Sequence, residues 1–384
     1  MYMSLTCMFY NSSYSVLNSK KNQMKKTLIF FTVLTTVMSC SKNSDNINTF
    51  GNNSAFELKS AGKPSLISID TTVWSKYLIY KPLTPHEKDS LAKVASPKST
   101  LVGNAAYVTN TLEGPEYTDY SGQIHFQVFS ATSTKTNHPI MTVSVSGGYA
   151  MVGGGALVYG YSGNGAFLTE SRPLNPTTWR GQSKDHIIAD PHYLKVYAIG
   201  MRIDNVDPTY LRSKIHITYN VSSYSDDPWT TVNTLDNCLL IGGGAFDDYG
   251  LGYGNMLKSS NPSGVQWAVS GGAYRRSSPS QITAYAIGIE NISYTTVGYL
   301  QTTVNQTSVG CLAGIAYCYA PVWDGYALTC PGGSSTNHLT GRLLVGLYPQ
   351  DSFPGDQVIS KDTPGFGDYG TLSAYALGIQ KRPY

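Results

Sequence analysis

The chain has 384 residues, of which 27 are Lys or Arg and 24 are Asp or Glu, and its formal net charge is +3. Charged residues make up 13% of the chain, about half the share of an average soluble domain, which excludes a disordered polyelectrolyte and a coiled coil. Gly (38 residues) and Tyr (29 residues) are unusually frequent. This composition indicates an all-β, turn-rich protein that is long enough for one large or two small domains.

The first forty residues have the pattern of an export signal. Met24 is followed by two lysines and an apolar run, 27–38, which is too short to span a bilayer as a helix. Small Ser39 and then Cys40 come after this run, which is typical of a secretory signal. The segment resembles the lipobox of Bacteroidetes-type lipoproteins, in which the cysteine is diacylated and becomes the mature N-terminus. The resemblance implies lipid attachment at Cys40 and removal of residues 1–39, with Met24 as the true start; an ordinary signal peptide is the alternative.

Removal of the signal changes the charge balance, because residues 1–39 contain four lysines and no acidic residue. The mature chain keeps 23 basic and 24 acidic side chains, a net charge of −1. A chain so close to neutrality has no electrostatic footprint for nucleic acid. We therefore expect no nucleic-acid partner and membrane attachment through the lipid alone, on the periplasmic or cell-surface face of the outer membrane.

A tether and a short extension follow the predicted anchor. Residues 40–60 are rich in Ser, Asn, Lys and Gly and have little periodicity, which is typical of a flexible linker. The extension, 61–110, contains one predicted helix that runs from Thr84 to about Ala95. Thr84 can cap this helix and Pro85 fits its first turn.

Residues 111–384 contain a threefold internal repeat. Each unit has a Thr-Val pair, small residues including glycine, a Leu-containing segment that ends in proline, and a Tyr-Ala-Ile/Leu-Gly signature. The signatures begin at Tyr197, Tyr285 and Tyr375. Agreement at this many positions predicts three related β units. The predicted units span about 120–205, 206–292 and 293–384.

The glycine clusters set the predicted register between the units. A Thr precedes the aligned glycine by eleven residues in each unit, at Gly153, Gly242 and Gly314. On this register, Leu328–Pro331 of the third unit corresponds to Leu168–Pro173 of the first. Strand-like residues follow the glycines, which disfavours a phosphate-binding loop because such a loop needs a helix after it. The third unit lacks the strand tryptophan that the first two units share.

Each unit is predicted to contain four or five strands separated by turns of Gly, Asn, Ser and Pro. In the second unit these strands lie at roughly 238–246, 254–260, 265–270 and 282–290. The first two units also share an alternating leading strand, at Ile124–Val128 and Ile215–Tyr219, which the third unit shortens to Val297–Val304.

Three units of this kind can close around a pseudo-threefold axis and bury their apolar faces together. Their plan, a glycine-bearing strand, a turn and an apolar closing strand, is similar to the vitelline membrane outer layer protein fold, a three-sheet β-prism. The resemblance implies an all-β, β-prism-like domain; a β-trefoil is built from shorter units. Trp179 and Trp267 recur within predicted strands, and we expect both in the core.

Four cysteines remain downstream of Cys40, and an even number in an exported domain suggests disulfides, with three possible connectivities. We favour Cys318–Cys330, because these residues flank a tight segment. We also favour Cys238–Cys311, because these residues occupy near-equivalent repeat positions. The chain contains no Cys-x-x-Cys pair, so zinc is disfavoured, and we expect no cofactor.

Motifs of catalysis are weak in this sequence. A polar insert of the first unit, Asp185–His192, can hold a metal in principle, but a solvated loop is the simpler interpretation, and we expect no metal. Acidic residues at loop sites, Asp247, Asp248 and Asp324, can in principle form a glycosidase pair if they face each other across a cleft. We predict no catalytic residue.

A Gly/Tyr-rich loop is predicted before the Leu-containing strand of each unit, and the aromatic residues of these three matched loops are the candidate ligand-binding residues. The candidates are Tyr159, Tyr161, Tyr249, Tyr253, Trp323 and Tyr326, together with Asp248 and Asp324. Rings flanked by short polar residues can stack on sugar faces, and the same chemistry serves adaptable protein-binding surfaces. We therefore predict a lectin-like, non-catalytic binding protein of the cell envelope. A protein-binding adhesion or scaffold module and a glycan hydrolase are the alternatives.

Overall fold

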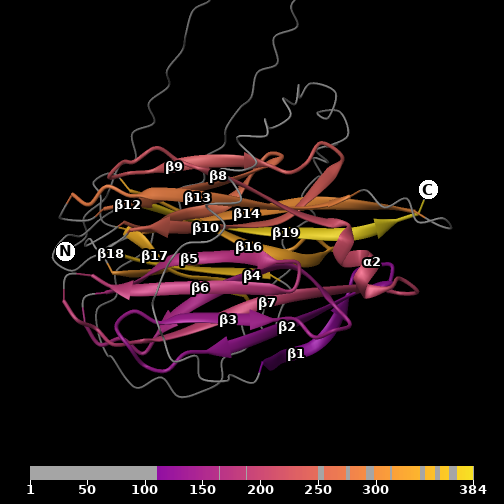
Figure 1. The fold of residues 1–384 in the computed structure, drawn as a ribbon, viewed down its shortest axis with the longest axis horizontal. Helices are drawn as coiled ribbons and strands as arrows, with labels where there is room; N and C mark the ends of the chain where they lie inside the picture. The colour runs from indigo at the N-terminus through magenta and orange to yellow at the C-terminus, as the bar shows by residue number, and fades with distance from the viewer. Residues whose placement is uncertain are drawn as a thin grey trace, which may run out of the picture. The chain divides into compact units, whose positions relative to one another are not determined.

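The computed structural model describes residues 110–163, 165–186, 188–249, 255–273, 277–290, 298–311, 314–337, 342–350, 355–362 and 370–383. The predicted lipid site Cys40, the tether, the helix at Thr84 and the candidate Tyr253 lie outside these residues. No helix in the described ranges is long and apolar enough to cross a membrane. The all-β prediction is confirmed: the described chain consists of strands and one short helix, α2 (Pro208–Ser213) (Figure 1).

The described part of the chain contains one strand ahead of the repeats and six strands in each repeat. The strand ahead of the repeats is β1 (Thr111–Thr118). The first repeat contains β2 (Ile124–Thr132), β3 (Ile140–Ser144), β4 (Ala150–Tyr159), β5 (Ala166–Asn175), β6 (Thr178–Asp185) and β7 (Tyr193–Ile203). The second contains β8 (Ile215–Val221), β9 (Trp229–Asn233), β10 (Cys238–Asp248), β11 (Met256–Ser263), β12 (Gln266–Gly272) and β13 (Gln281–Glu290). The third contains β14 (Tyr299–Cys311), β15 (Ile315–Pro321), β16 (Ala327–Asn337), β17 (Arg342–Pro349), β18 (Gly355–Asp362) and β19 (Gly370–Arg382).

Each sheet takes its strands from two repeats. The orders are β1-β2-β7-β4-β17-β18-β15, β3-β6-β5-β10-β13-β8 and β14-β19-β16-β11-β12-β9. One half of the first repeat (β2, β7, β4) therefore lies in one sheet and its other half (β3, β6, β5) in the next. The same exchange runs through all three repeats in a cycle, which gives the domain its pseudo-threefold, prism-like plan.

The two halves of each repeat pack face to face as a sandwich, which we call the first, second or third lobe. The indole rings of Trp179 and Trp267 fill the centres of the first two lobes, fully buried as predicted. The Trp267 Nε1 donates to the Ser260 Oγ at 2.9 Å. Each ring lies against a glycine, Gly154 or Gly243, where a Cβ would collide with it. Close approach of ring and backbone therefore explains these two glycines.

Neighbouring lobes join through short ladders at equivalent positions. The pairs are Ala156–Leu347, Ala245–Ser171 and Gly333–Ser260. At the centre, the Cys330 Sγ lies 3.5 Å from the Gly243 carbonyl oxygen and 3.9 Å from the Gly154 carbonyl oxygen. The central strands of all three lobes therefore meet around Cys330.

Strand pairing corrects the predicted register of the third repeat. A β-bulge occurs at the same place in β4, β10 and β16, and it aligns Gly153 and Gly242 with Cys330 rather than with Gly314. The Leu-containing segment of the third repeat is accordingly Leu344–Pro349 in β17. Its leading strand is the whole of β14, thirteen residues long. The equal spacing of eleven residues was a coincidence of a Thr-Val pair with an unrelated turn glycine.

The third repeat replaces its tryptophan by a buried carboxyl group. Asp356 pairs with Pro349 as the tryptophans pair with the equivalent prolines of the other repeats. Pro331 takes the place of the glycine under the indole ring, and a Cβ at that position excludes an indole. Asp356 is fully buried, and burial raises its pKa well above the ordinary range. Its Oδ2 accepts the backbone N–H of Tyr375 at 3.1 Å.

The predicted disulfides are wrong, because the four cysteines in the described residues are free thiols. Cys330 lies at the meeting point of the lobes, whereas Cys318 is buried in β15 with its Sγ 3.3 Å from the Thr307 carbonyl oxygen. Cys238 in β10 and Cys311 in β14 belong to different sheets. The incorrect register of the third repeat made these two positions look equivalent.

Candidate functional site

Two of the predicted ligand-binding tyrosines lie at lobe junctions under lysine side chains. The Lys361 Nζ lies 4.5 Å from the ring centroid of Tyr161, and the Lys184 Nζ lies 4.4 Å from that of Tyr249. The Gln182 amide also donates to the Tyr249 hydroxyl at 3.0 Å. Both rings are partly buried, and burial lowers the pKa of Lys184 to about 8. The side chains of Tyr161 and Tyr249 therefore form contacts between neighbouring lobes.

The remaining candidates do not form three matched loops. Tyr159, at the end of β4, stacks on Tyr193 with a centroid distance of 5.3 Å, and Asp248 is exposed at the end of β10. The segment Trp323–Tyr326 instead precedes β16, at the opposite strand end. The structure therefore does not bring Asp248 and Asp324 to equivalent positions, and Asp247 is fully buried.

The polar insert of the first repeat is used in contacts that fix its own loops. The His138 Nε2 lies 2.8 Å from the Asp185 Oδ1. The His192 ring lies 2.8 Å from the Ser183 Oγ through Nε2 and 2.7 Å from the Asp190 carbonyl oxygen through Nδ1. In the ranges that the structure describes, no three His, Cys, Asp or Glu side chains form a metal-binding group.

A concave site lies where the β1–β2 hairpin meets the third lobe. Its volume is about 250 Å³. It is lined by Tyr120, Asp324, Gly325, Gln380 and Arg382. We call this site the hairpin pocket. It combines an aromatic ring, a carboxylate, an amide and a guanidinium in one hollow.

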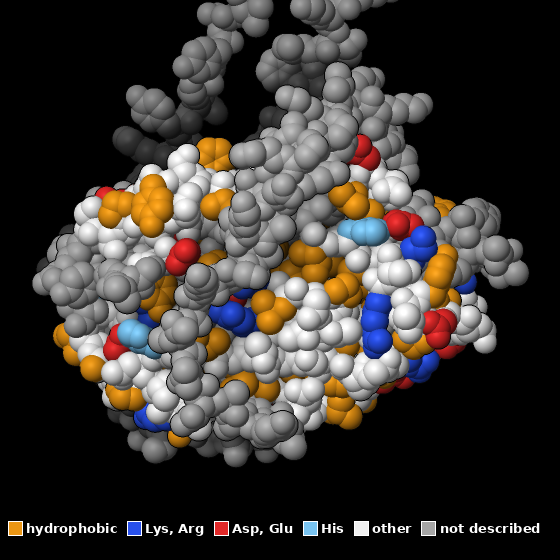
Figure 2. All heavy atoms as spheres, in the orientation of Figure 1, with side chains coloured by type: hydrophobic (Ala, Val, Ile, Leu, Met, Phe, Trp, Pro, Cys, Tyr) orange, Lys and Arg blue, Asp and Glu red, His pale blue; other side chains and the backbone are white. Residues whose placement is uncertain are grey.

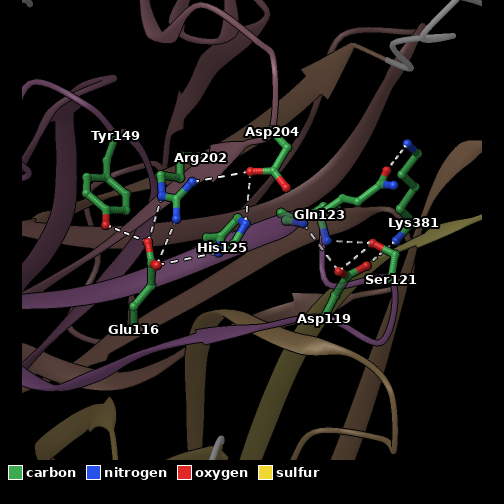
Figure 3. A network of polar contacts seen from close by, with 10 residues as sticks. Glu116, Asp119, Ser121, Gln123, His125, Tyr149, Arg202, Asp204 and Lys381 are labelled. Carbon is green, nitrogen blue, oxygen red and sulfur yellow. Dashed lines mark hydrogen bonds and ion pairs between the residues drawn. The ribbon is translucent and has the colours of Figure 1, made fainter. Parts of the chain in front are cut away.

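The hairpin turn holds Tyr120 in place while leaving its side chain 86% exposed. The carboxylate of Asp119 accepts the Ser121 hydroxyl through Oδ1 and the backbone N–H of Lys381 through Oδ2, both at 2.7 Å (Figure 3). The Tyr120 N–H itself donates to the Gly325 carbonyl oxygen at 2.9 Å. Because the backbone of the turn is already anchored, ligand binding has to fix only the side-chain torsions of Tyr120 and not the loop.

The wall of the hairpin pocket that Gln380 and Arg382 form is held by an amide of β14. The Gln301 Oε1 accepts from the Arg382 Nε at 3.1 Å and from the Gln380 Nε2 at 3.4 Å. The Arg382 guanidinium lies 6.0 Å from the ring centroid of Tyr326, and the Trp323 indole donates to a backbone carbonyl of β14 at 3.3 Å. Two of the predicted aromatic residues therefore support this wall.

The first lobe has an ion-pair network at the equivalent position. Strand register aligns Arg202 with Gln380 and His125 with Gln301. Glu116 of β1 accepts two bonds from Arg202, at 2.7 and 2.8 Å, and lies 3.4 Å from His125 (Figure 3). The bidentate bond to Arg202 lowers the pKa of Glu116 to about 2. In the first lobe, the charged side chain of Glu116 from β1 therefore binds the polar groups at this position.

The second lobe pairs its charges internally at the same position. The Glu290 carboxylate lies 2.6 Å from the Lys214 Nζ and 2.9 Å from the His216 Nε2. Arg212 of α2, the helix between β7 and β8, donates to carbonyl oxygens of the loop before β4 in the first lobe, including that of Tyr149. Of the three positions, the one in the third lobe adjoins the hairpin pocket and presents its polar groups to it.

No protein-family model matches the chain, and no curated protein matches it in sequence. Sequence reasoning found Asp324 and its aromatic neighbours but missed Tyr120, Gln380 and Arg382. The run Asp119–Gly122 is a recognisable turn sequence. It marked a hairpin without indicating that the hairpin reaches the last strand of the chain.

Proposed function

We propose that this protein is a lipid-anchored, non-catalytic carbohydrate-binding protein of the bacterial cell envelope, and that the hairpin pocket is its ligand site. The observation that carries the proposal is the exposed ring of Tyr120, on an anchored backbone, beside Asp324 and Arg382 in one hollow. The apolar face of a sugar can stack on the tyrosine ring, while its hydroxyls donate to the carboxylate and accept from the guanidinium.

Charge and size support a small, uncharged ligand unit. Figure 2 shows acidic and basic side chains scattered among uncharged ones, without a broad area of one sign on the face drawn. A volume of about 250 Å³ is below that of most drug-sized ligand sites, which suits a terminal sugar unit. Among the described residues, the lining includes one carboxylate, that of Asp324, whereas glycoside hydrolysis ordinarily uses two, so we propose binding rather than hydrolysis.

Tyr120→Ala is expected to weaken glycan binding at least ~10-fold, because it removes the stacking surface, and ~10-fold corresponds to about 1.4 kcal/mol. The full chain, purified in detergent, is screened on a glycan array, and the best ligand is titrated calorimetrically. Tyr224→Ala is the matched control, since Tyr224 is 67% exposed in the second repeat. A wild-type chain that binds no glycan, or a Tyr120→Ala variant that binds as well as wild type, contradicts the proposal.

The lipid anchor is tested separately through Cys40. Cys40→Ala removes the thiol that diacylation requires, so we expect the protein to leave the membrane fraction and to lose its acyl label. Fractionation of cells, with metabolic labelling by a fatty acid, measures both effects. Unchanged membrane association and processing would exclude lipidation at this residue.

A further inference from the structure

Two arginines of the first repeat lie opposite each other on neighbouring strands and share one buried carboxylate. Arg172 of β5 pairs with Arg180 of β6, the strand beside it (Figure 1). The carboxylate of Glu170, which is fully buried, accepts the Arg172 Nε at 2.6 Å and the Arg180 Nε at 2.9 Å. Both carboxylate oxygens are therefore used, and the two guanidinium groups are held side by side. We call these three residues the arginine cluster; its net charge is positive, because two cations share one anion.

The terminal nitrogens of both guanidinium groups are available to a ligand. A guanidinium has five N–H donors, and in the described part of the chain each of these arginines donates a hydrogen bond through Nε alone. The side chains of Arg172 and Arg180 are 13% and 25% exposed, so solvent reaches both.

Aromatic rings from the second repeat hold one of the two guanidinium groups. The Arg172 guanidinium lies 5.2 Å from the ring centroid of Phe246 in β10 and 5.0 Å from that of Tyr285 in β13. These contacts and the bond to Glu170 restrict the arginine side chain before any ligand binds. A ligand that bonds to the terminal nitrogens therefore has less side-chain freedom to remove.

The other two repeats have no charged residue at the positions of the arginine cluster. Equivalent positions follow from the prolines that pair with Trp179, Trp267 and Asp356. The equivalent sets are Ser259, Asn261 and Ala268 in the second repeat and Gly346, Tyr348 and Gln357 in the third. Like charges directly opposite each other destabilise an antiparallel pair, and a buried ion pair often stabilises a fold no more than well-packed uncharged residues do. The fold therefore does not require two opposed arginines here.

We propose that the arginine cluster binds a phosphate or sulfate ester group. A guanidinium donates two parallel N–H bonds to an oxyanion. A phosphate group presents three acceptor oxygens, and a sulfate ester has the same tetrahedral arrangement, so either group can accept from two guanidiniums at once. A carboxylate has two oxygens, which one guanidinium already matches. The cluster shares no residue with the lining of the hairpin pocket, so this inference does not rest on the proposed function.

Methyl phosphate and methyl sulfate are suitable probes, because they carry the ester groups without a sugar. The full chain, purified in detergent, is titrated calorimetrically at low salt with each ester and with acetate. We expect at least one ester to bind ~10-fold or more tightly than acetate, because acetate cannot engage both guanidiniums. The ester that binds more tightly identifies the class of ligand.

Two variants test whether the anion binds at the arginine cluster. Arg180→Lys keeps the positive charge and removes the planar fork, so we expect the preferred ester to bind at least ~10-fold more weakly. The triple variant Glu170→Ser, Arg172→Asn, Arg180→Ala has the residues of the second repeat, which the same lobe plan already accommodates, and we expect it to lose binding.

Lys258→Gln is the matched control for the triple variant. Lys258 of β11 is 23% exposed and forms an ion pair with Asp227, and its replacement changes the net charge by the same amount as the triple variant does. We expect this control to bind the preferred ester as tightly as wild type. Thermal unfolding of all variants without probe shows that they are folded.

Loss of binding in both arginine variants, with binding kept in Lys258→Gln, supports the proposal. A wild-type chain that binds neither ester, or that binds acetate as tightly, overturns it. Binding that survives the triple variant places the anion elsewhere and also overturns it, as does an equal loss in Lys258→Gln. Because the probes contain no sugar, none of these results decides whether the hairpin pocket binds glycans, which its own test measures.

Discussion

Trp267→Ala is expected to lower the free energy of unfolding by about 3–5 kcal/mol. The indole ring is fully buried at the centre of the second lobe, where it packs on Gly243. Its removal forfeits this burial, opens a cavity and leaves the buried Ser260 hydroxyl without its donor at 2.9 Å. Urea unfolding, followed by fluorescence of the remaining tryptophans, measures the change.

Trp229→Ala is the matched control for this experiment. Trp229 lies in β9, which pairs with the strand of Trp267, but its side chain is 71% exposed. Its truncation is expected to change stability by no more than about 0.5 kcal/mol. Equal losses for the two variants would refute the assignment of Trp267 to the centre of the lobe.

Asp247→Asn is expected to remove a fall in stability that the wild-type protein shows between about pH 4 and pH 7. Asp247 is fully buried, and burial raises its pKa to about 7. Between the unfolded and folded pKa values the folded state binds the extra proton, so stability falls as pH rises. The difference from the ordinary value of 3.8 corresponds to about 4 kcal/mol. Asparagine retains the shape without the titration, so the variant is the more stable protein at pH 7.

Thermal unfolding of both proteins across this pH range measures the effect. Asp356, whose pKa burial also raises, remains in both proteins, so the difference between the two curves isolates Asp247. Asp248→Asn is the control, since Asp248 is the exposed neighbour in the chain. If the stability of wild type and of Asp247→Asn changed in parallel with pH, ionisation of the Asp247 carboxyl group would not lower the stability of the folded protein, which contradicts the prediction.

The fold class and the repeat could be predicted because the closing strands repeat a buried pattern. Tyr197, Tyr285 and Tyr375 begin the same signature in β7, β13 and β19, and each pairs with a glycine of the adjacent central strand. The register of the third repeat could not be predicted. In the third repeat, Cys330 and Pro331 occupy the positions at which the other repeats have glycines. The coincidental spacing of eleven residues led to the incorrect alignment with Gly314.

The candidate site could be predicted only in part, because its residues come from distant segments. Asp324 was found through its aromatic neighbours, but Tyr120 belongs to a hairpin outside the repeats and Arg382 to the last strand. The loop composition also predicted that Tyr161 and Tyr249 are exposed ligand-binding residues. In the structure, the ring of each contacts a lysine side chain from an adjoining lobe. Such contacts depend on how three lobes close together, which local periodicity does not encode.

We propose that the hairpin pocket binds carbohydrate. A crystal structure of the protein with the oligosaccharide selected on the array tests it most directly. We expect a sugar ring stacked on Tyr120, with hydroxyl oxygens within about 3.2 Å of the Asp324 carboxylate and the Arg382 guanidinium. A sugar bound elsewhere on the molecule, with the hairpin pocket empty at saturating ligand, would contradict it.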